Sequence, residues 1–499
     1  MSCEESRRRR RVPILALLAS LVAGCMVGPT FHRPSAPTAA AWRDVDGERL
    51  RTDGGAPERW WRVFDDTALD DLIVRAYREN LPLRAAGLRV VEAQALRGIA
   101  FGNLFPQTQE LTGALTYTHA SLATGEPVPR RDVTVGQIGF DASWELDLWG
   151  RFRRELESAD AGLLAFLADY DDVLVSLVGE VASDYVQLRV LEARLALARD
   201  NVRVQRESLD LARVRFEAGG TSDLDVQQAT TLLADTEATI PQLESQERQT
   251  ANALSVLLGV PASDLPPLAA TDAAIPVAPP TVTVGIPADL LRRRPDVRRA
   301  EHQLAAQSAR VGVAVADLLP HVELAGSIGL SADTAEHLLA GHSLSALGGP
   351  QFVWPVLNYG RLLNEVRLQD ATFQELVATY GDTVLRAQRD VENALVGYVR
   401  GAEQVARLTD AVTAADKAVD LSLIQYREGA ADYTRVLDTQ QAKLREDDSL
   451  ASARGGVTLE VIALYKALGG GWELRQGADV VPEETKDEMR ARMGWPTWR

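Results

Sequence analysis

Residues 144–151 read Trp144-Glu145-Leu146-Asp147-Leu148-Trp149-Gly150-Arg151, and the chain returns to this pattern 210 residues later as Trp354-Pro355-Val356-Leu357-Asn358-Tyr359-Gly360-Arg361. The same offset carries Phe216-Glu217-Ala218-Gly219 onto Tyr426-Arg427-Glu428-Gly429. It also carries Leu258-Gly259 onto Leu468-Gly469. Long uninterrupted helices would keep such a spacing, because an insertion rotates every later residue off its face. The sequence therefore predicts one architecture built twice.

The first residues of the chain have the features of a bacterial export signal. Arg7 to Arg11 form a basic segment, and residues 12–20 form an apolar run too short for a transmembrane helix. Small residues followed at once by Cys25 resemble a lipoprotein processing site, which would make Cys25 the acylated first residue of the mature chain. The alternative is a cysteine that merely follows an ordinary cleavage site. Because Met26 follows Cys25, the resemblance to other bacterial lipoproteins favours release toward the outer membrane.

Cysteine usage and charge narrow the class of protein further. Removal of residues 1–24 takes away Cys3, so lipid attachment explains the remaining Cys25 better than redox chemistry does. An acylated residue anchors a protein to a membrane without spanning it. The formal net charge is -17, and it becomes about -20 without the five Arg and two Glu of residues 1–24. This charge argues against nucleic-acid binding and suits a water-filled, cation-tolerant surface or lumen.

The period of the apolar residues changes at Pro106. Before it, residues 82–105 show helical spacing, and after it the period becomes two. We expect strands at about 107–119 and 132–149, with apolar side chains such as Phe140 on one face and acidic ones on the other. Such strands fit a membrane barrel with lipid outside and water inside, although an amphipathic strand of a soluble sandwich is the alternative. Because no run after the signal reaches the roughly 18 apolar residues of a spanning helix, any membrane crossing must use strands.

Long helical hairpins follow the strands in each copy. Residues 150–216 read as one helix, and at about 1.5 Å per residue it would be on the order of 100 Å long. A helix of that length exceeds a globular core, so it must lie in a coiled or barrel-like assembly or span a compartment. The turn at Gly219 leads to a return helix with Thr221 or Ser222 as its N-cap and a kink at Pro241.

The organisation that follows is a mostly α-helical chain with a β-barrel segment. We assign a lipoprotein signal peptide (1–24), an N-terminal leader (25–59), repeat 1 (60–260, long hairpin 150–259), a linker (261–288), repeat 2 (289–470, strands about 321–331 and 350–358, long hairpin 359–469) and a C-terminal tail (471–499). Four strands per chain are too few to close a barrel, so the chain must oligomerise to remove its sheet edges. The tail has no interpretation beyond a surface extension.

Several motifs, in order and at consistent spacing, resemble one family. They are Cys25-Met26-Val27-Gly28-Pro29 with His32-Arg33-Pro34, Trp60-Trp61 with Phe64, the segment Leu291-Arg292-Arg293-Arg294-Pro295-Asp296-Val297-Arg298-Arg299-Ala300-Glu301, and the paired turns near Phe216 and Tyr426. The chain resembles the TolC-like outer membrane efflux proteins, in their lipid-anchored NodT- or OprM-like branch, over residues 25 to about 472.

The resemblance implies a homotrimer in which three chains pool twelve strands into one outer membrane barrel, continued by an α-helical tunnel through the periplasm. It implies a passive exit duct of a tripartite pump, with a periplasmic adaptor protein and an inner membrane transporter as partners. The protein would be lipid-anchored in the outer membrane, with no cofactor other than the covalent lipid on Cys25 and no nucleic-acid partner. The cargo, the cognate adaptor and the resting state of the channel are not specified by the sequence.

The resemblance also carries over particular residues. Phe216, Gly219, Tyr426 and Gly429 match the periplasmic tips at which adaptors dock, while plain interhelical packing is the alternative for the two aromatic residues.

The periplasmic gate of lipid-anchored relatives uses an apolar residue followed four positions later by Asp. Thr434 and Asp438 occupy these positions here, so the Asp is kept and Thr434 departs from the apolar pattern. Arg435 places a cation close by, and a merely solvated Asp438 is the alternative to a gate.

Little in the sequence indicates an enzyme. His321, His337 and His342 lack metal-ligand spacing on one helix and are best explained as water-facing loop and strand-end residues. Asp171-Asp172 reads as the polar face of a helix. Two other functions stay open: the outer membrane duct of a type I protein secretion system, and a helical lipoprotein scaffold without a channel.

Overall fold

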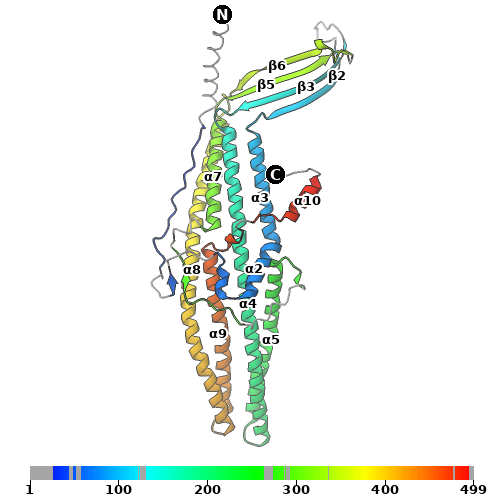
Figure 1. Ribbon diagram of the computed structural model, residues 1–499. Coiled ribbons are helices and arrows are strands. Elements are labelled where there is room, and N and C mark those ends of the chain that lie inside the picture. The colour runs from blue at the N-terminus through cyan, green and yellow to red at the C-terminus, as the bar shows by residue number, and fades with distance from the viewer. Residues whose placement is uncertain are drawn as a thin grey trace. The chain divides into compact units, whose positions relative to one another are not determined.

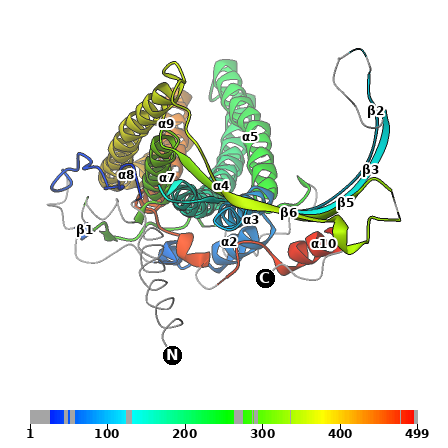
Figure 2. The ribbon, with the colours of Figure 1, turned by 90° about the horizontal axis from the view of Figure 1, so that it is seen from above.

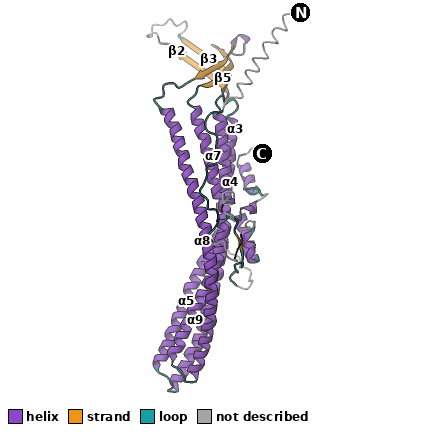
Figure 3. Cartoon of the chain, turned by 90° about the vertical axis from the view of Figure 1, so that its left-hand side faces the viewer, coloured by secondary structure: helices purple, strands orange, loops and turns teal. Residues whose placement is uncertain are grey.

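The computed structural model describes residues 26–43, 49–51, 58–121, 123, 131–262, 274–285, 287, 293–334, 336–475 and 478–493 (Figure 1). The predicted signal peptide and Cys25 lie outside these residues. Helix predominates in the described chain (Figure 3). Among the described residues, no helix is long and apolar enough to cross a membrane.

Helices and strands follow one another in two similar series. The first series comprises η1 (Trp60–Phe64), α2 (Thr67–Glu79), α3 (Leu81–Gly102), β2 (Thr108–His119), β3 (Asp132–Leu146), α4 (Arg151–Glu217) and α5 (Asp223–Leu257). The second comprises α7 (Pro295–Ala316), β5 (His321–Ala332), η5 (Gly341–Ser343), β6 (Leu344–Val353), α8 (Arg361–Arg427) and α9 (Tyr433–Ala467). Both α4 and α8 have 67 residues, and both α5 and α9 have 35.

The remaining described elements are small. Strands β1 (Leu50–Arg51) and β4 (Val282–Thr283) form a parallel pair. The C-terminal part holds η6 (Trp472–Arg475) and α10 (Glu483–Met493). The chain divides into two compact units, which are residues 1–35, 90–166 and 299–380, and residues 36–89, 167–298 and 381–499.

In the first unit, the strands form one antiparallel sheet in the order β2-β3-β5-β6, which Figure 2 shows as a curved ribbon. Paired residues share a face, so the register assigns every side chain to one side. One face is apolar, and its members include Leu111, Leu115, Ile138, Phe140, Trp144, Leu324, Ile328 and Phe352. The other is largely polar, and its members include Glu110, Thr112, Gln137, Asp141, Glu145, Glu323, Ser327 and Gln351.

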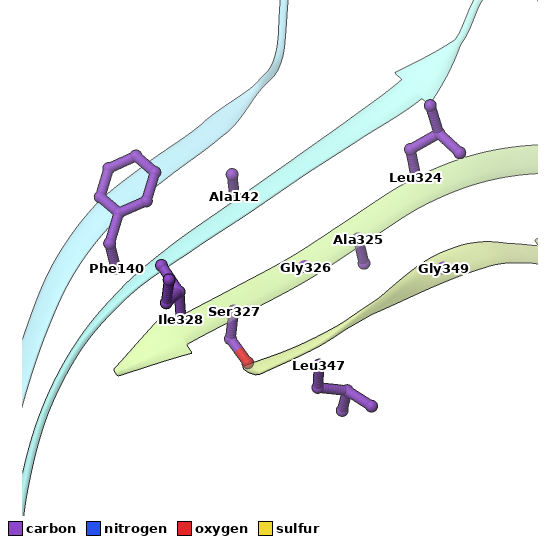
Figure 4. A pocket seen from close by; sticks show the side chains of 9 residues that line it. All are labelled: Phe140, Ala142, Leu324, Ala325, Gly326, Ser327, Ile328, Leu347 and Gly349. Carbon is purple, nitrogen blue, oxygen red and sulfur yellow. The ribbon is translucent and has the colours of Figure 1, made fainter. Parts of the chain in front are cut away.

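Both faces of the sheet are open in the single chain. Leu111 and Leu115 of the apolar face are 77% and 79% exposed. Figure 4 shows the alternation around a shallow hollow of about 430 Å³, with Leu324 and Phe140 on one side and Ser327 and Leu347 on the other. A sheet whose apolar face is exposed over its whole length needs an apolar environment or a partner that covers this face.

Strand β6 corrects one expectation. A strand at 350–358 is wrong, because Leu344–Val353 pair with β5 and residues 354–358 leave the sheet. Glycine and proline at 348–350 resemble a loop in the sequence, yet they pair within the ladder and its register fixes them there. Strand β3 ends at Leu146 rather than at 149, because the Asp147 side chain accepts hydrogen bonds from the N–H groups of Phe152 and Arg153 and thereby caps α4.

In the second unit, side chains from the first helices and from α9 pack together in the core. Trp60 is 0% exposed and stacks on Tyr465 of α9 with ring centroids 5.5 Å apart. Residues 60–79 form two separate helices, η1 and α2, since Asp66 caps α2 by accepting from the N–H groups of Ala68 and Leu69.

The C-terminal tail is more than a surface extension. Asp171 of α4 is fully buried and accepts two hydrogen bonds from Arg475, at 2.7 and 3.2 Å. Arg298 approaches the same carboxylate at 3.5 Å. The interpretation of Asp171-Asp172 as a polar helix face is therefore wrong for Asp171, because a charge without solvent requires such partners. Val481 is also buried, so residues near it are fixed to the body of this unit.

Candidate functional site

The two long hairpins turn in the same way. Gly219 and Gly429 have φ of +73° and +76°, a conformation that favours glycine. The N–H groups of Gly219 and Gly220 donate to the main-chain oxygens of Phe216 and Arg215. Gly429 and Ala430 repeat the pattern in the second hairpin. These two hydrogen bonds close the carbonyl end of each helix and stabilise both turns.

The aromatic residues next to these turns differ in exposure. Phe216 is 44% exposed, whereas Tyr426, at the same position of the second hairpin, is 1% exposed. Tyr426 packs edge-to-face on Tyr433, with ring centroids 5.4 Å apart. Phe216 is therefore available to a partner, and Tyr426 instead supports the turn from inside.

Arg215 and Ser208 connect the two hairpins at this place. The Arg215 guanidinium lies over the Tyr426 ring at 4.5 Å, and it donates to the main-chain oxygen of Gly220 at 3.2 Å. The hydroxyls of Ser208 and Tyr433 lie 3.2 Å apart within hydrogen-bond distance. Burial raises the pKa of both the Tyr426 and the Tyr433 hydroxyl above the ordinary value, so both stay neutral. The turn motifs of the sequence include Arg215 and Tyr426, but they do not indicate Ser208.

Thr434 and Asp438 lie one turn apart on α9, and both are exposed. Arg435 is exposed beside them, while Tyr433 and Val436 are buried against the other helices. The structure thus brings the two predicted gate residues onto one open strip of α9, close to the turn at Gly429. Side chains on such a strip can face a lumen or a partner without loss of the packing underneath.

A cluster of charged side chains lies at the junction of the sheet and the long helices, and it was not predicted from the sequence. Arg151 Nε lies 3.0 Å from Asp317, and Glu145 lies 2.9 Å from His321 Nδ1. Burial raises the pKa of the Glu155 carboxyl in the same place. His321 is therefore a partner of Glu145 rather than only a water-facing residue. The feature of the sequence that could have indicated this role of His321 is its position directly after Pro320, at the start of a strand.

His337 and His342 lie close together in the segment between β5 and β6, with ring centroids 5.7 Å apart. Among the described residues, no group of three or more His, Cys, Asp or Glu side chains could hold a metal ion. The arrangement of the described side chains thus offers apolar and polar surfaces and a pair of rigid turns.

The sequence profile described as outer membrane efflux protein matches residues 72–260 and again 286–470. The chain belongs to this outer membrane efflux protein family. The two matches fall on the two series of helices and strands, so the family pattern covers both the sheet and the long hairpins. The resemblance predicted from the motifs is confirmed.

Relatives and solved structures agree with the family. Pyoverdine export outer membrane protein OpmQ of Pseudomonas putida is 34% identical over 471 residues, which are 93% of this chain and 98% of that protein. Nodulation protein T of Rhizobium leguminosarum bv. trifolii is 32% identical over 397 residues, 80% of this chain and 83% of the relative. The structure of the outer-membrane channel OprN has a TM-score of 0.84 at 33% identity and covers 90% of this chain and 100% of that one.

These findings confirm the predicted function and place of the protein. This member of the outer membrane efflux protein family is an efflux channel of the outer membrane that extends into the periplasm. The α-helical hairpins are those of TolC-like channels.

Proposed function

We propose that this efflux channel is the passive exit duct of a tripartite system, with a periplasmic adaptor and an inner membrane transporter supplying cargo and energy. The observation that carries the proposal is the union of 67-residue helices with a sheet that is apolar on one face and polar on the other. A duct needs both, because lipid must be met on one side and water on the other.

The working unit is a homotrimer. Among the described residues, β2 and β6 have a neighbouring strand on one edge only. Three copies of the four-stranded sheet pair these edges and close a twelve-stranded barrel, which removes every unpaired edge. The polar faces then line the lumen, and the apolar faces meet lipid.

Asp438 and Thr434 form the periplasmic gate in this arrangement. Three copies of Asp438 facing one axis create a ring of like charges that attracts cations and holds water. Arg435 reduces the net charge of that ring, and the hydroxyl of Thr434 makes the constriction more polar than an apolar residue would. The exposure of Asp438 and Thr434 in the single chain supports this role.

The adaptor docks at the turns that contain Gly219 and Gly429. Phe216 offers an exposed apolar side chain there, and Leu224 and Ile424 are 63% and 54% exposed close by. Buried Tyr426 fixes the shape of the surface from below. The lipid on Cys25 adds an anchor in the outer membrane, since an acyl chain holds a protein at a membrane without spanning it.

Efflux by living cells tests the proposal. A strain lacking the chromosomal gene is complemented with the native chain, with Phe216→Asp, or with Leu339→Asp, a matched change at a loop side chain that is 84% exposed. We expect Phe216→Asp to abolish efflux of a fluorescent dye while leaving the assembled channel in the outer membrane, and Leu339→Asp to retain efflux. Normal efflux by Phe216→Asp would contradict docking at this turn. Loss of secretion of an exported protein, with dye efflux unchanged, would favour a type I secretion duct.

A further inference from the structure

The residues between β5 and β6 have a defined local structure. We call residues 336–343 the β5–β6 segment. The N–H of Ala340 donates to the main-chain oxygen of His337 at 2.9 Å, and the N–H of Ser343 donates to that of Ala340, also at 2.9 Å. The Ser343 hydroxyl donates to the main-chain oxygen of His337, and the rings of His337 and His342 lie 5.7 Å apart. These contacts give the segment one compact shape.

The β5–β6 segment lies over the apolar face of the sheet. A Cβ added to Gly136 of β3 would lie 3.8 Å from Cδ1 of Leu115 and 3.8 Å from Cδ2 of Leu338. Gly136 pairs with Leu115 and shares a face with Phe140, so this Cβ would point to the apolar side. Leu338 therefore folds back from the end of β5 onto the apolar face, above a position that has no side chain of its own.

The position of Gly136 along β3 gives the level of Leu338 in the membrane. Trp144 belongs to the apolar face, and its Nε1 donates to the main-chain oxygen of Leu104 at the end of the sheet next to the helices. Tryptophan at such a place is typical of one edge of the lipid-facing band. Gly136 lies eight positions from Trp144, which is about 20 Å along the membrane normal for a tilted strand. Since the band is about 25 Å tall, Leu338 lies near its outer edge.

Polar side chains at the ends of β2 and β3 mark the level of the lipid headgroups. Tyr117 and His119 lie on the same face as Leu115. The Tyr117 hydroxyl donates to Asp132 at 2.6 Å, and His119 Nδ1 lies 2.6 Å from the same carboxylate oxygen. A tyrosine with its hydroxyl in a polar contact is typical of the boundary between hydrocarbon and water. The apolar face thus ends in polar side chains just beyond the level of Leu338.

The β5–β6 segment itself combines apolar and polar side chains. Leu338 is half-buried, whereas Leu339 is 84% exposed. The His337 imidazole is 58% exposed, and its Nδ1 lies 3.0 Å from the Thr334 hydroxyl. A single exposed leucine is ordinary on a surface that faces water. Leu339, however, extends from a segment that covers the lipid-facing side of the sheet.

We propose that the β5–β6 segment is an interfacial anchor, which inserts the Leu339 side chain among the acyl chains of the outer leaflet and keeps the His337 and His342 rings at the level of the headgroups. The inference rests on the proposed duct, because it requires that the apolar face meets lipid. Its partner is the boundary between acyl chains and headgroups, which suits a leucine beside rings with an apolar body and a polar tip.

The location of the segment favours lipid over a second protein chain as its partner. Leu338 lies over β3, which has neighbouring strands on both edges, so this contact is away from the edges of the sheet. Cargo passes on the polar side of the sheet in the proposed duct. The anchor therefore fixes the level of the barrel in the membrane and takes no part in conduction.

Fluorescence quenching at introduced cysteines tests the anchor in the full-length protein, reconstituted in phosphatidylcholine vesicles. Leu339→Cys carries a polarity-sensitive fluorophore, and the lipid carries a nitroxide either near the headgroup end of its acyl chain or near the methyl end. Leu115→Cys reports from the apolar face, and Leu347→Cys reports from the polar face. Leu115 and Leu347 are 79% and 80% exposed in the single chain, which matches them to Leu339. The unsubstituted protein, labelled in parallel, controls for its own cysteine.

We expect the fluorophores at Leu339→Cys and Leu115→Cys to emit at shorter wavelength and to be quenched more by the nitroxide near the headgroup end than by the deeper one. The fluorophore at Leu347→Cys should be quenched by iodide in the water instead. Quenching of Leu339→Cys by iodide alone would overturn the anchor and leave the duct intact. Protection of Leu339→Cys from both quenchers would show that protein covers it, which also overturns the anchor. Water contact at Leu115→Cys would contradict the proposed barrel itself.

Leu338→Ala tests whether packing on the sheet holds the segment at this level. With the fluorophore at Leu339→Cys, we expect this second change to reduce both the emission shift and the quenching by lipid, because alanine does not reach the space above Gly136. The matched change Leu347→Ala, on the polar face, should leave both readings as they are. Unchanged readings in Leu338→Ala would contradict the part of the proposal that rests on this contact.

Discussion

Arg154 donates from Nε to the main-chain oxygen of Val27 at 3.0 Å, although the two residues lie 127 positions apart in the chain. The same guanidinium donates to the oxygen of Gly28 at 3.2 Å, and its side chain is 2% exposed. A Cβ on Gly28 would lie 2.4 Å from the Cα of Gly312, so the segment passes α7 in direct backbone contact. The residues that follow Cys25 are thus held at a defined place, one that suits an anchored N-terminus.

Replacement of Arg154 by Met should release this segment. The carbonyls of Val27 and Gly28 lose the buried guanidinium as their donor, and we expect a loss of about 2–3 kcal/mol in the free energy of unfolding. Chemical denaturation and the rate of tryptic cleavage at Arg33 measure the two effects. The control Arg213→Met removes an exposed guanidinium of α4. It should change the free energy of unfolding by no more than about 0.5 kcal/mol and leave the cleavage rate unchanged. An unchanged cleavage rate in Arg154→Met would show that other contacts hold the segment.

The carboxylate of Asp171 is fully buried in the second unit and pairs with Arg475 and Arg298. Its replacement by Ala leaves Arg475 and Arg298 without this partner, which should cost about 3–5 kcal/mol. The matched control Asp382→Ala breaks an exposed pair with Arg386 and should cost less than about 1 kcal/mol. Denaturant unfolding compares them, and equal losses would mean that Asp171 is not essential to the fold.

Tyr185 predicts a pH dependence at alkaline pH. Its hydroxyl donates to Asp66 at 2.7 Å, and burial raises its pKa to about 12. Because the folded-state pKa lies above the unfolded value of about 10, the neutral form favours folding. This contribution is complete below pH about 10 and is lost as the pH rises to about 12. It should amount to about 2–3 kcal/mol.

The variant Tyr185→Phe isolates that contribution. It lacks the titrating group, so its free energy of unfolding should fall less than that of the native protein between pH 10 and pH 12. Urea titrations at several pH values give the difference, and the other buried tyrosines cancel in the comparison. Parallel curves for the two proteins would contradict the assignment.

The sequence predicts elements whose boundaries have a local cause. Pro106 and Pro320 end helices, and the period changes directly after them, so β2 and β5 lie within a residue or so of the expected ranges. Strand β6 is displaced from its expected range because its limits depend on pairing with β5, where Gly348 and Gly349 are ordinary ladder positions.

Contacts between distant residues explain the remaining differences. Nothing near Asp171 in the sequence indicates Arg475, which lies 304 residues away and removes the need for solvent at that carboxylate. Phe216 and Tyr426 occupy equal positions in the repeat, yet Phe216 is exposed and Tyr426 is buried, because Tyr433 and Arg215 pack on the Tyr426 ring. The internal repeat of the sequence therefore predicts where a side chain lies in the fold better than it predicts which residues surround that side chain.

Conductance of the purified trimer in planar bilayers tests the central claim of a gated duct most directly. The native protein is compared with Asp438→Ala and with Glu484→Ala, a matched loss of an exposed carboxylate on α10. We predict discrete cation-preferring openings that become larger or more frequent in Asp438→Ala, because the loss of the carboxylate ring loosens the constriction, while Glu484→Ala behaves as the native protein does. No conductance from any of the three proteins, in samples shown to be folded and trimeric, would contradict the account.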